Sequence, residues 1–206
     1  GVVMERTGNE LRGMSCLALE EVTPPRKQII SSRSFGQLVH DLPRLCESVA
    51  SYMSKAAEKL RRENSVCEAI QVFVQTNPFR EQDAQYSKCI TVPLPNASSD
   101  TRLLVRAALF GLKRIYRPGF AYKKTGVMLI GIAPASIRQL SLLPQHGAGD
   151  KSQRLMDAMD KLNQAYGRNT LSVFSTNNRK SWAMRRENMS PCYTTSWNEV
   201  PVAHAH

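Results

Sequence analysis

The chain has 206 residues, 42% of them hydrophobic, and its 28 Lys and Arg against 17 Asp and Glu give a formal net charge of +11. This hydrophobic fraction is sufficient for a buried core, which excludes general disorder. No apolar run approaches the roughly 20 residues of a membrane span, and no signal-peptide pattern opens the chain, so we expect a cytoplasmic protein. Because the chain starts with Gly1 inside a predicted helix, Val2 to Leu11, we expect a piece of a longer protein.

The positive charge is concentrated in the middle of the chain. Residues 1–26 have a net charge of −1 and residues 134–206 a net charge of +4, whereas residues 27–133 carry 16 basic and eight acidic side chains. A bias of this size toward one sign favours a polyanionic partner. Nucleic acid is the first candidate, and an acidic protein or a membrane surface is the alternative.

Five scattered cysteines are present: Cys16, Cys46, Cys67, Cys89 and Cys192. They form no C-x-x-C pair, and no two histidines stand at zinc-finger spacing. We therefore expect reduced, buried or half-buried thiols and no metal or other cofactor in this chain. His204 and His206 are interpreted as part of a terminal tail.

The middle segment begins with a predicted strand over Lys27 to Phe35. Asp41 is a candidate N-cap for a helix that continues to Arg62, with Pro43 tolerated in its first turn. Apolar residues recur in this helix at helical spacing, at Leu45, Cys46, Val49, Tyr52, Met53, Ala56 and Leu60. Residues 69–75 alternate as a strand.

A polar loop over residues 78–85 leads to another predicted strand, 87–92, and residues 93–99 are predicted to be a turn-rich break. A second helix starts near Asp100, with a predicted buried stripe of Leu103, Leu104, Ala107, Ala108, Leu112 and Ile115. A last strand is predicted over residues 122–132. The order β-α-β-β-α-β predicts an α+β domain of the ferredoxin-like, split βαβ kind, with two helices on one sheet face.

The other face of such a sheet is open to solvent and suits nucleic acid. The aromatic pattern of an RNA-recognition domain is absent, and short polar and basic side chains suit phosphates better than bases. The candidate DNA-binding residues are Ser31, Ser32, Arg33, Ser34, Lys123 and Lys124. Ordinary solvent-facing polarity is the alternative, and Lys123 and Lys124, being adjacent, should point to opposite faces.

Other basic residues are weaker candidates for DNA contacts. Arg102, Arg106 and Lys113 lie on a helix that is expected to face away from DNA. Lys59, Arg61 and Arg62 end a helix, where the helix dipole alone explains them.

Pro134 begins a predicted linker that includes the glycine-rich segment 145–149. A small module follows, with a helix over residues 152–166 and a hairpin formed by residues 170–175 and 182–186. Met156, Met159 and Trp182 are predicted to form its core. About 50 residues give little independent stability, so we expect this module to dock on something.

Four strings resemble UmuC-type proteins, the catalytic subunits of bacterial DNA polymerase V in the Y family of translesion polymerases: 29–36 (IISSRSFG), 56–62 (AAEKLRR), 122–129 (YKKTGVML) and 190–195 (SPCYTT). The resemblance covers nearly the whole chain in the order of the family's C-terminal half. It implies that residues 1–26 are the end of the thumb, 27–133 the little finger, 134–150 a linker and 151–206 the UmuC-branch C-terminal domain. Cys192 departs from the pattern, which has Arg there.

The resemblance also implies what the chain lacks. Polymerase chemistry needs carboxylates that hold two metal ions about 4 Å apart, and in this family they lie in the palm, before Gly1. Asp157 and Asp160 are interpreted as residues of a solvated helix face. The fragment should therefore not catalyse alone, with Mg²⁺ needed only by the parent polymerase. The family further implies a UmuD-type accessory dimer and RecA as partners, a role in the SOS response to DNA damage, and a nucleoid location in the bacterial cytoplasm.

A short motif follows the last strand: Gln139, Leu140, Ser141, Leu142 and Leu143. It resembles the pentapeptide by which bacterial polymerases bind the sliding clamp, in which Phe is commoner at the last position. An extended peptide in a groove would use the Gln amide for register and the large apolar side chains for affinity. The alternative is that the three leucines pack back on the domain.

Two functions are therefore open. The first is the DNA-gripping and clamp-tethering half of an error-prone DNA polymerase that acts on damaged primer–template. The second is a protein-interaction module that recruits the clamp, the UmuD-type dimer and RecA, with little DNA binding of its own.

Overall fold

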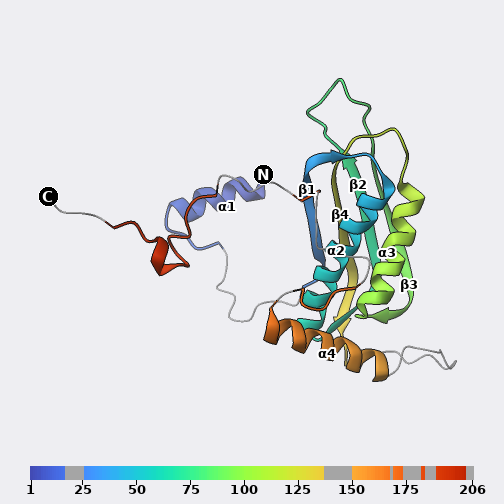
Figure 1. Cartoon of the computed structure of the whole chain (residues 1–206). Coiled ribbons are helices and arrows are strands. Elements are labelled where there is room, and N and C mark those ends of the chain that lie inside the picture. The colour runs from blue at the N-terminus through green and yellow to red at the C-terminus, as the bar shows by residue number, and fades with distance from the viewer. Residues whose placement is uncertain (17–25, 137–149, 168, 174–181, 184–188, 203–206) are drawn as a thin grey trace.

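The computed structural model describes residues 1–16, 26–136, 150–167, 169–173, 182–183 and 189–202 (Figure 1). The elements are α1 (Val2–Leu11), β1 (Ile29–Val39), α2 (Leu42–Arg62), β2 (Ser65–Thr76), β3 (Ser87–Ser98), α3 (Thr101–Ile115), β4 (Tyr122–Pro134), α4 (Asp150–Tyr166) and a 3-10 turn, η1 (Trp197–Glu199). The predicted order β-α-β-β-α-β is confirmed. No described helix is both long and apolar enough to cross a membrane.

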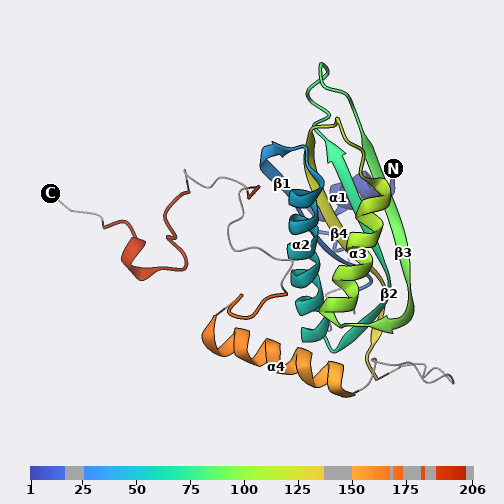
Figure 2. The same ribbon diagram turned by 45° about the vertical axis from the view of Figure 1, so that its right-hand side comes forward.

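The four strands form one antiparallel sheet in the order β1-β4-β2-β3. Helices α2 and α3 lie side by side on one face of this sheet (Figure 2). Strands β1 and β2 run parallel to each other with β4 between them, which is the split βαβ arrangement. The α+β, ferredoxin-like fold class is therefore confirmed, and β1 and β3 are the edge strands.

The core lies between the sheet and the two helices. Helix α2 buries Leu45, Val49, Met53, Ala56 and Leu60 completely, as its periodicity predicts. Its N-cap is Asp41, whose carboxylate accepts a hydrogen bond from the Arg44 backbone N–H at 2.9 Å. The α2 stripe was thus predicted well from spacing alone.

Helix α3 differs from the prediction at Leu103 and at Val105, which is buried although it was not part of the predicted stripe. Leu104, Ala108, Leu112 and Ile115 are buried as expected, but Leu103 is 40% exposed. The buried stripe of α3 contains Leu104, Val105, Ala108 and Leu112, and Leu103 lies more than 100° around the helix from its centre.

Strand β3 is longer than predicted, because the break expected over residues 93–99 is mostly strand. The strand continues through Pro93 and Pro95 to Ser98. Proline lacks a backbone N–H, so it is excluded from central strands but tolerated where that N–H would face solvent. The edge position of β3 makes this possible, and edge position is not visible in a single sequence.

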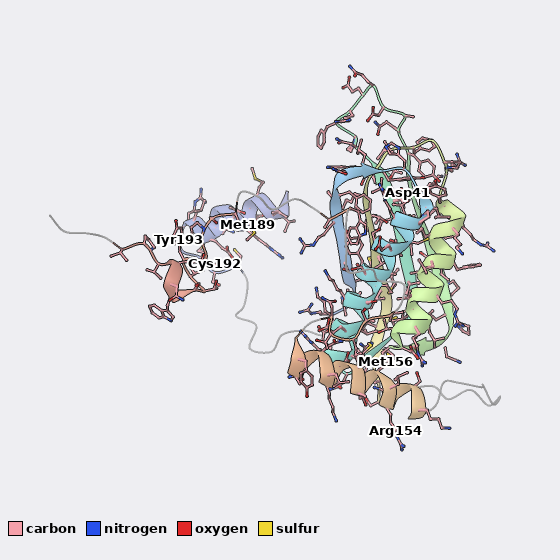
Figure 3. All side chains as sticks on the ribbon, viewed as in Figure 1. Asp41, Arg154, Met156, Met189, Cys192 and Tyr193 are labelled. Carbon is pink, nitrogen blue, oxygen red and sulfur yellow. The ribbon has the colours of Figure 1, made fainter. Side chains whose placement is uncertain are left out.

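Helix α4 lies across the end of the layer formed by the C-terminus of α2 and the N-terminus of α3 (Figures 1 and 2). Met156 is only 2% exposed on the side of α4 that faces this layer (Figure 3). The described parts of the expected hairpin, residues 170–173 and 182–183, are not strand, and the rest of it lies outside the described residues.

Trp182 corrects the expectation that it belongs to a separate core of the final module. Its ring packs edge-on against Phe35 of β1 and Tyr52 of α2, with centroid distances of 6.1 and 5.6 Å. Its indole N–H donates to Glu47 Oε2 at 3.2 Å, and its backbone oxygen accepts from Gly36 N–H at 3.3 Å. Trp182 is therefore part of the same hydrophobic core as the sheet and its helices.

Candidate nucleic-acid interface

The sheet face opposite α2 and α3 is covered by no described element. Directly paired residues of antiparallel strands share a face, so the register defines this open face. We call the open face the residues Ile30, Ser32, Ser34, Gln71, Phe73, Gln75, Ser87, Cys89, Thr91, Lys124, Gly126 and Met128. They alternate with the buried Val72, Val127 and Leu129 of the core.

Three rows cross the open face. One row is polar from edge to edge, with Ser34 beside Lys124, then Gln75, then Ser87. These hydroxyl, ammonium and amide groups are hydrogen-bond donors to phosphate oxygens. The polar row is the part of the open face best suited to a nucleic-acid backbone.

Phe73 and Gly126 form the centre of the next row. An ideal Cβ built on Gly126 would lie 2.3 Å from Ser32 Cβ and 2.5 Å from Phe73 Cζ, both too close for real atoms. Glycine is therefore required at position 126, because the Phe73 ring lies over the backbone of β4.

The six predicted DNA-binding residues are divided between two surfaces. Ser32, Ser34 and Lys124 belong to the open face. Ser31 pairs with Val127 and Arg33 with the buried Thr125, so both are directed to the helix side of the edge strand. The side chains of residues 31–34 therefore alternate between the two faces of the edge strand and do not form one surface.

Lys123 lies at an irregularity of β4. The register shifts between Gln75–Lys124 and Thr76–Tyr122, so Lys123 is the extra residue of a β-bulge. Its ammonium donates to the Phe35 backbone oxygen at 2.7 Å. A structural hydrogen bond therefore occupies Lys123, whereas Lys124 lies in the polar row.

Charge is sparse on the open face itself. Lys124 is the only cation among its twelve residues, and the other basic residues of the sheet domain lie on its edges, loops and helices. Arg102, Arg106 and Lys113 are exposed on α3, on the opposite side of the sheet. The sheet domain is therefore basic around the open face rather than on it.

The sequence did not predict the ion pair between Arg61 of α2 and Asp160 of α4, which connects α4 to the sheet domain. Arg61, attributed to the helix dipole, has a side chain only 5% exposed that forms a bidentate ion pair with Asp160 of α4, with N···O distances of 2.6 and 2.7 Å. Its guanidinium also donates to Ser99 O and Thr101 Oγ1. Asp160 is therefore not part of a purely solvated face.

A second contact lies beside the first. Asp100 caps α3, binds the Arg102 guanidinium at 2.8 Å and accepts a hydrogen bond from Ser152 of α4. Burial alone would raise the pKa of Asp100, but the hydrogen bonds from Arg102 and Ser152 outweigh it, and the pKa lies below its usual value. The Asp100 carboxylate stays ionised and joins the two helices.

The expectation of buried or half-buried thiols is wrong for Cys89 and Cys192, which are exposed. All five cysteines are free, and the described residues contain no group of three or more His, Cys, Asp or Glu that could hold a metal ion. The candidate clamp motif, Gln139 to Leu143, lies outside the described residues, as do His204 and His206.

The fold defines a split βαβ domain with an exposed sheet, and the sequence comparisons place it in a family. Residues 26–142 match the impB/mucB/samB family C-terminal domain, and residues 153–203 match a domain of unknown function, DUF4113. Since the first match covers more than half of the chain, the chain belongs to the impB/mucB/samB family. The sequence resemblance to UmuC-type proteins is confirmed at this level.

The chain is similar to whole proteins of that family along almost its full length. It is 41% identical to protein MucB of Escherichia coli, 40% to protein UmuC of Salmonella typhimurium strain LT2 and 38% to protein ImpB of Salmonella typhimurium. These alignments cover 97–98% of this chain but only 47–48% of each relative. The chain therefore spans about half the length of the curated relatives it matches.

Proposed function

We propose that this chain is the DNA-gripping and clamp-tethering part of an error-prone translesion DNA polymerase that acts in the SOS response. Its family membership supports this function, and so does the polar row of the open face. In that row Ser34, Lys124 and Gln75 present adjacent donors on three strands. The domains of the proposal are a thumb end (1–26), a little finger (27–133), a clamp-binding linker (134–150) and a C-terminal module (151–206).

The proposed grip uses the DNA backbone rather than the bases. Phosphate contacts position a protein on a duplex without reading sequence. The edge strand β1 also has backbone N–H groups without a neighbouring strand, which phosphate oxygens accept from readily. A grip of this kind does not inspect the base pair, so a template distorted by damage would still be held.

The chemistry of synthesis is assigned to the rest of the parent protein. Phosphoryl transfer uses carboxylates with two metal ions, and in this proposal they belong to a palm domain outside this chain. Mg²⁺ is therefore a cofactor of the parent polymerase only. The proposed partners are damaged primer–template DNA, the sliding clamp through Gln139 to Leu143, a UmuD-type dimer and RecA.

One observation favours the second function, a module that recruits proteins. Lys124 is the only cation of the open face. Most basic residues of the sheet domain therefore lie on its edges, loops and helices, where they are available to an acidic protein partner. DNA binding by the chain alone distinguishes the two functions.

The test is fluorescence anisotropy of the 206-residue chain on primer–template DNA from about 50 to 200 mM salt. We expect log affinity to fall linearly with log salt, because each phosphate contact releases counterions. Lys124→Gln should reduce the slope by about 0.9, the value for one phosphate, whereas Arg106→Gln on α3 should not. Absence of binding at low salt would reject the grip and leave the protein-recruiting function.

A further inference from the structure

A cavity lies at the sheet edge between the edge strand β1 and helix α2. These two elements lie next to each other (Figure 2). The volume of the cavity is about 330 Å³, and one of its lining residues, Asn169, follows α4. The cavity is lined by Ile30, Ser31, Ser32, Arg33, Tyr52, Lys55, Glu58, Lys59, Arg62 and Asn169. It is separate from the polar row of the open face.

The charge of this lining is strongly positive. Four cations, from β1 and α2, surround one carboxylate. That carboxylate, Glu58, already pairs with Arg62 at 2.5 Å. A concave site with this excess of positive charge concentrates anions.

Tyr52 supplies an independent observation. It is only 2% exposed, and its hydroxyl has no hydrogen-bond partner among the described residues. A buried hydroxyl without a partner is destabilising and therefore rare. The Tyr52 ring packs edge-on against Trp182, and Tyr52 is one of the residues that line the cavity, so a ligand bound there is the candidate partner for the hydroxyl.

The hydroxyl is available as a donor. Burial raises the pKa of Tyr52 to about 12, against an opposing effect of the nearby Arg33 guanidinium. The group therefore stays protonated at neutral pH. Ser31 adds a hydroxyl from the strand, and the guanidinium of Arg33 adds a planar fork of N–H donors.

We propose that this cavity binds a phosphate group, carried by a nucleic-acid strand or by a free phosphate compound. Donors reach the cavity from β1 and α2, and such convergence matches the several acceptor oxygens of a tetrahedral phosphate. The volume is in the range of small-ligand sites and admits a phosphate with the sugar attached to it. This site goes beyond the proposed open-face grip, because three of its four cations belong to α2 and none belongs to the polar row.

The first test is titration of the 206-residue chain with inorganic phosphate, with chloride of equal ionic strength as the reference. We expect saturable NMR shifts at the amides of residues 31–33. Tyr52→Phe should weaken binding about tenfold, the usual effect of one hydrogen bond to a charged group. Lys59→Gln with Arg62→Gln should abolish the shifts, whereas the charge-matched Arg106→Gln with Lys113→Gln should retain them. Equal losses in both double variants would overturn the proposal.

Stability gives a second readout. Because the hydroxyl lacks a partner, Tyr52→Phe should unfold at the same temperature as the unmodified chain, or higher, without phosphate. A clearly lower unfolding temperature would mean that the hydroxyl is already bonded within the protein, and the proposal would fall.

Short single-stranded oligonucleotides identify the source of the phosphate. If Lys59→Gln with Arg62→Gln weakens oligonucleotide binding more than the α3 control does, the ligand is a nucleic-acid strand. If only inorganic phosphate binding is lost, the ligand is a free phosphate compound. Lys124→Gln should leave the phosphate titration unchanged, so failure of the open-face grip and failure of this site are separate results.

Discussion

At the scale of single residues, Gly126 determines how closely the Phe73 ring approaches β4. Glycine is needed there because the space that a Cβ would fill is occupied by the Ser32 Cβ and the Phe73 ring. The Ser32 Cβ is fixed to its own backbone and can move little. The contact between the Phe73 ring and the backbone of β4 thus depends on the missing side chain at position 126.

Gly126→Ala should destabilise the chain by about 1–3 kcal/mol, the usual effect of overpacking, because strand β1 must shift to make room. Denaturant unfolding followed by circular dichroism measures this. The matched control is Gly8→Ala in α1, where a Cβ meets nothing within 4 Å. A Gly126→Ala variant as stable as the control would contradict the close packing at this point.

Residue-level expectations succeeded where a local rule decides and failed where distant residues meet. Asp41 was predicted as a cap from its neighbours alone. Opposite directions for Lys123 and Lys124 follow from strand alternation, but the bulge that occupies Lys123 depends on pairing with β2. The ion pair of Arg61 with Asp160 joins positions 99 apart in the sequence, which no local pattern reveals.

At the scale of elements, the packing of α4 against the sheet domain depends on the ion pair between Arg61 and Asp160. Asp160→Asn should loosen α4, because it leaves the buried Arg61 guanidinium without its charged partner. We expect faster amide hydrogen exchange over residues 150–166, by about tenfold or more, with α2 and α3 little changed.

The control for this prediction is Asp157→Asn, which makes the same chemical change on the same helix. Asp157 is exposed and accepts a hydrogen bond only from Gln153 among the interactions described, so its loss should affect exchange little. Equal acceleration in both variants would show that total charge, not the Arg61 contact, holds α4.

Element order was predictable, while sheet order was not. Periods of about 3.6 and 2 located both helices and all four strands of the sheet domain. Which strands lie at the edges depends on long-range pairing, and this is why the proline-containing half of β3 was expected to be a break. The open face needed the full register, so only three of its twelve residues were among the candidates.

At the scale of the whole molecule, tethering and gripping are proposed to use separate parts of the chain. Gln139→Ala with Leu142→Ala should abolish binding to the sliding clamp, because it removes the register-fixing amide and one apolar anchor. DNA affinity should be unchanged. Surface plasmon resonance on immobilised clamp, with anisotropy on DNA in parallel, measures both.

The control is Arg138→Gln, which changes a neighbour of the motif without touching the five residues. Clamp binding that survives in the double variant would remove the tether from the proposal while leaving the DNA grip in place.

The position of Trp182 has a consequence for how this architecture is inherited. The residue falls within the second family match, yet its ring completes the core of the first. If the gene were split between residues 142 and 153, the first product would expose the rings of Phe35 and Tyr52 to solvent. The second product would expose the indole of Trp182. We therefore expect the two segments to be inherited together. A chimera that takes one segment from a relative should fold only if its Trp182, Phe35 and Tyr52 positions still pack against one another.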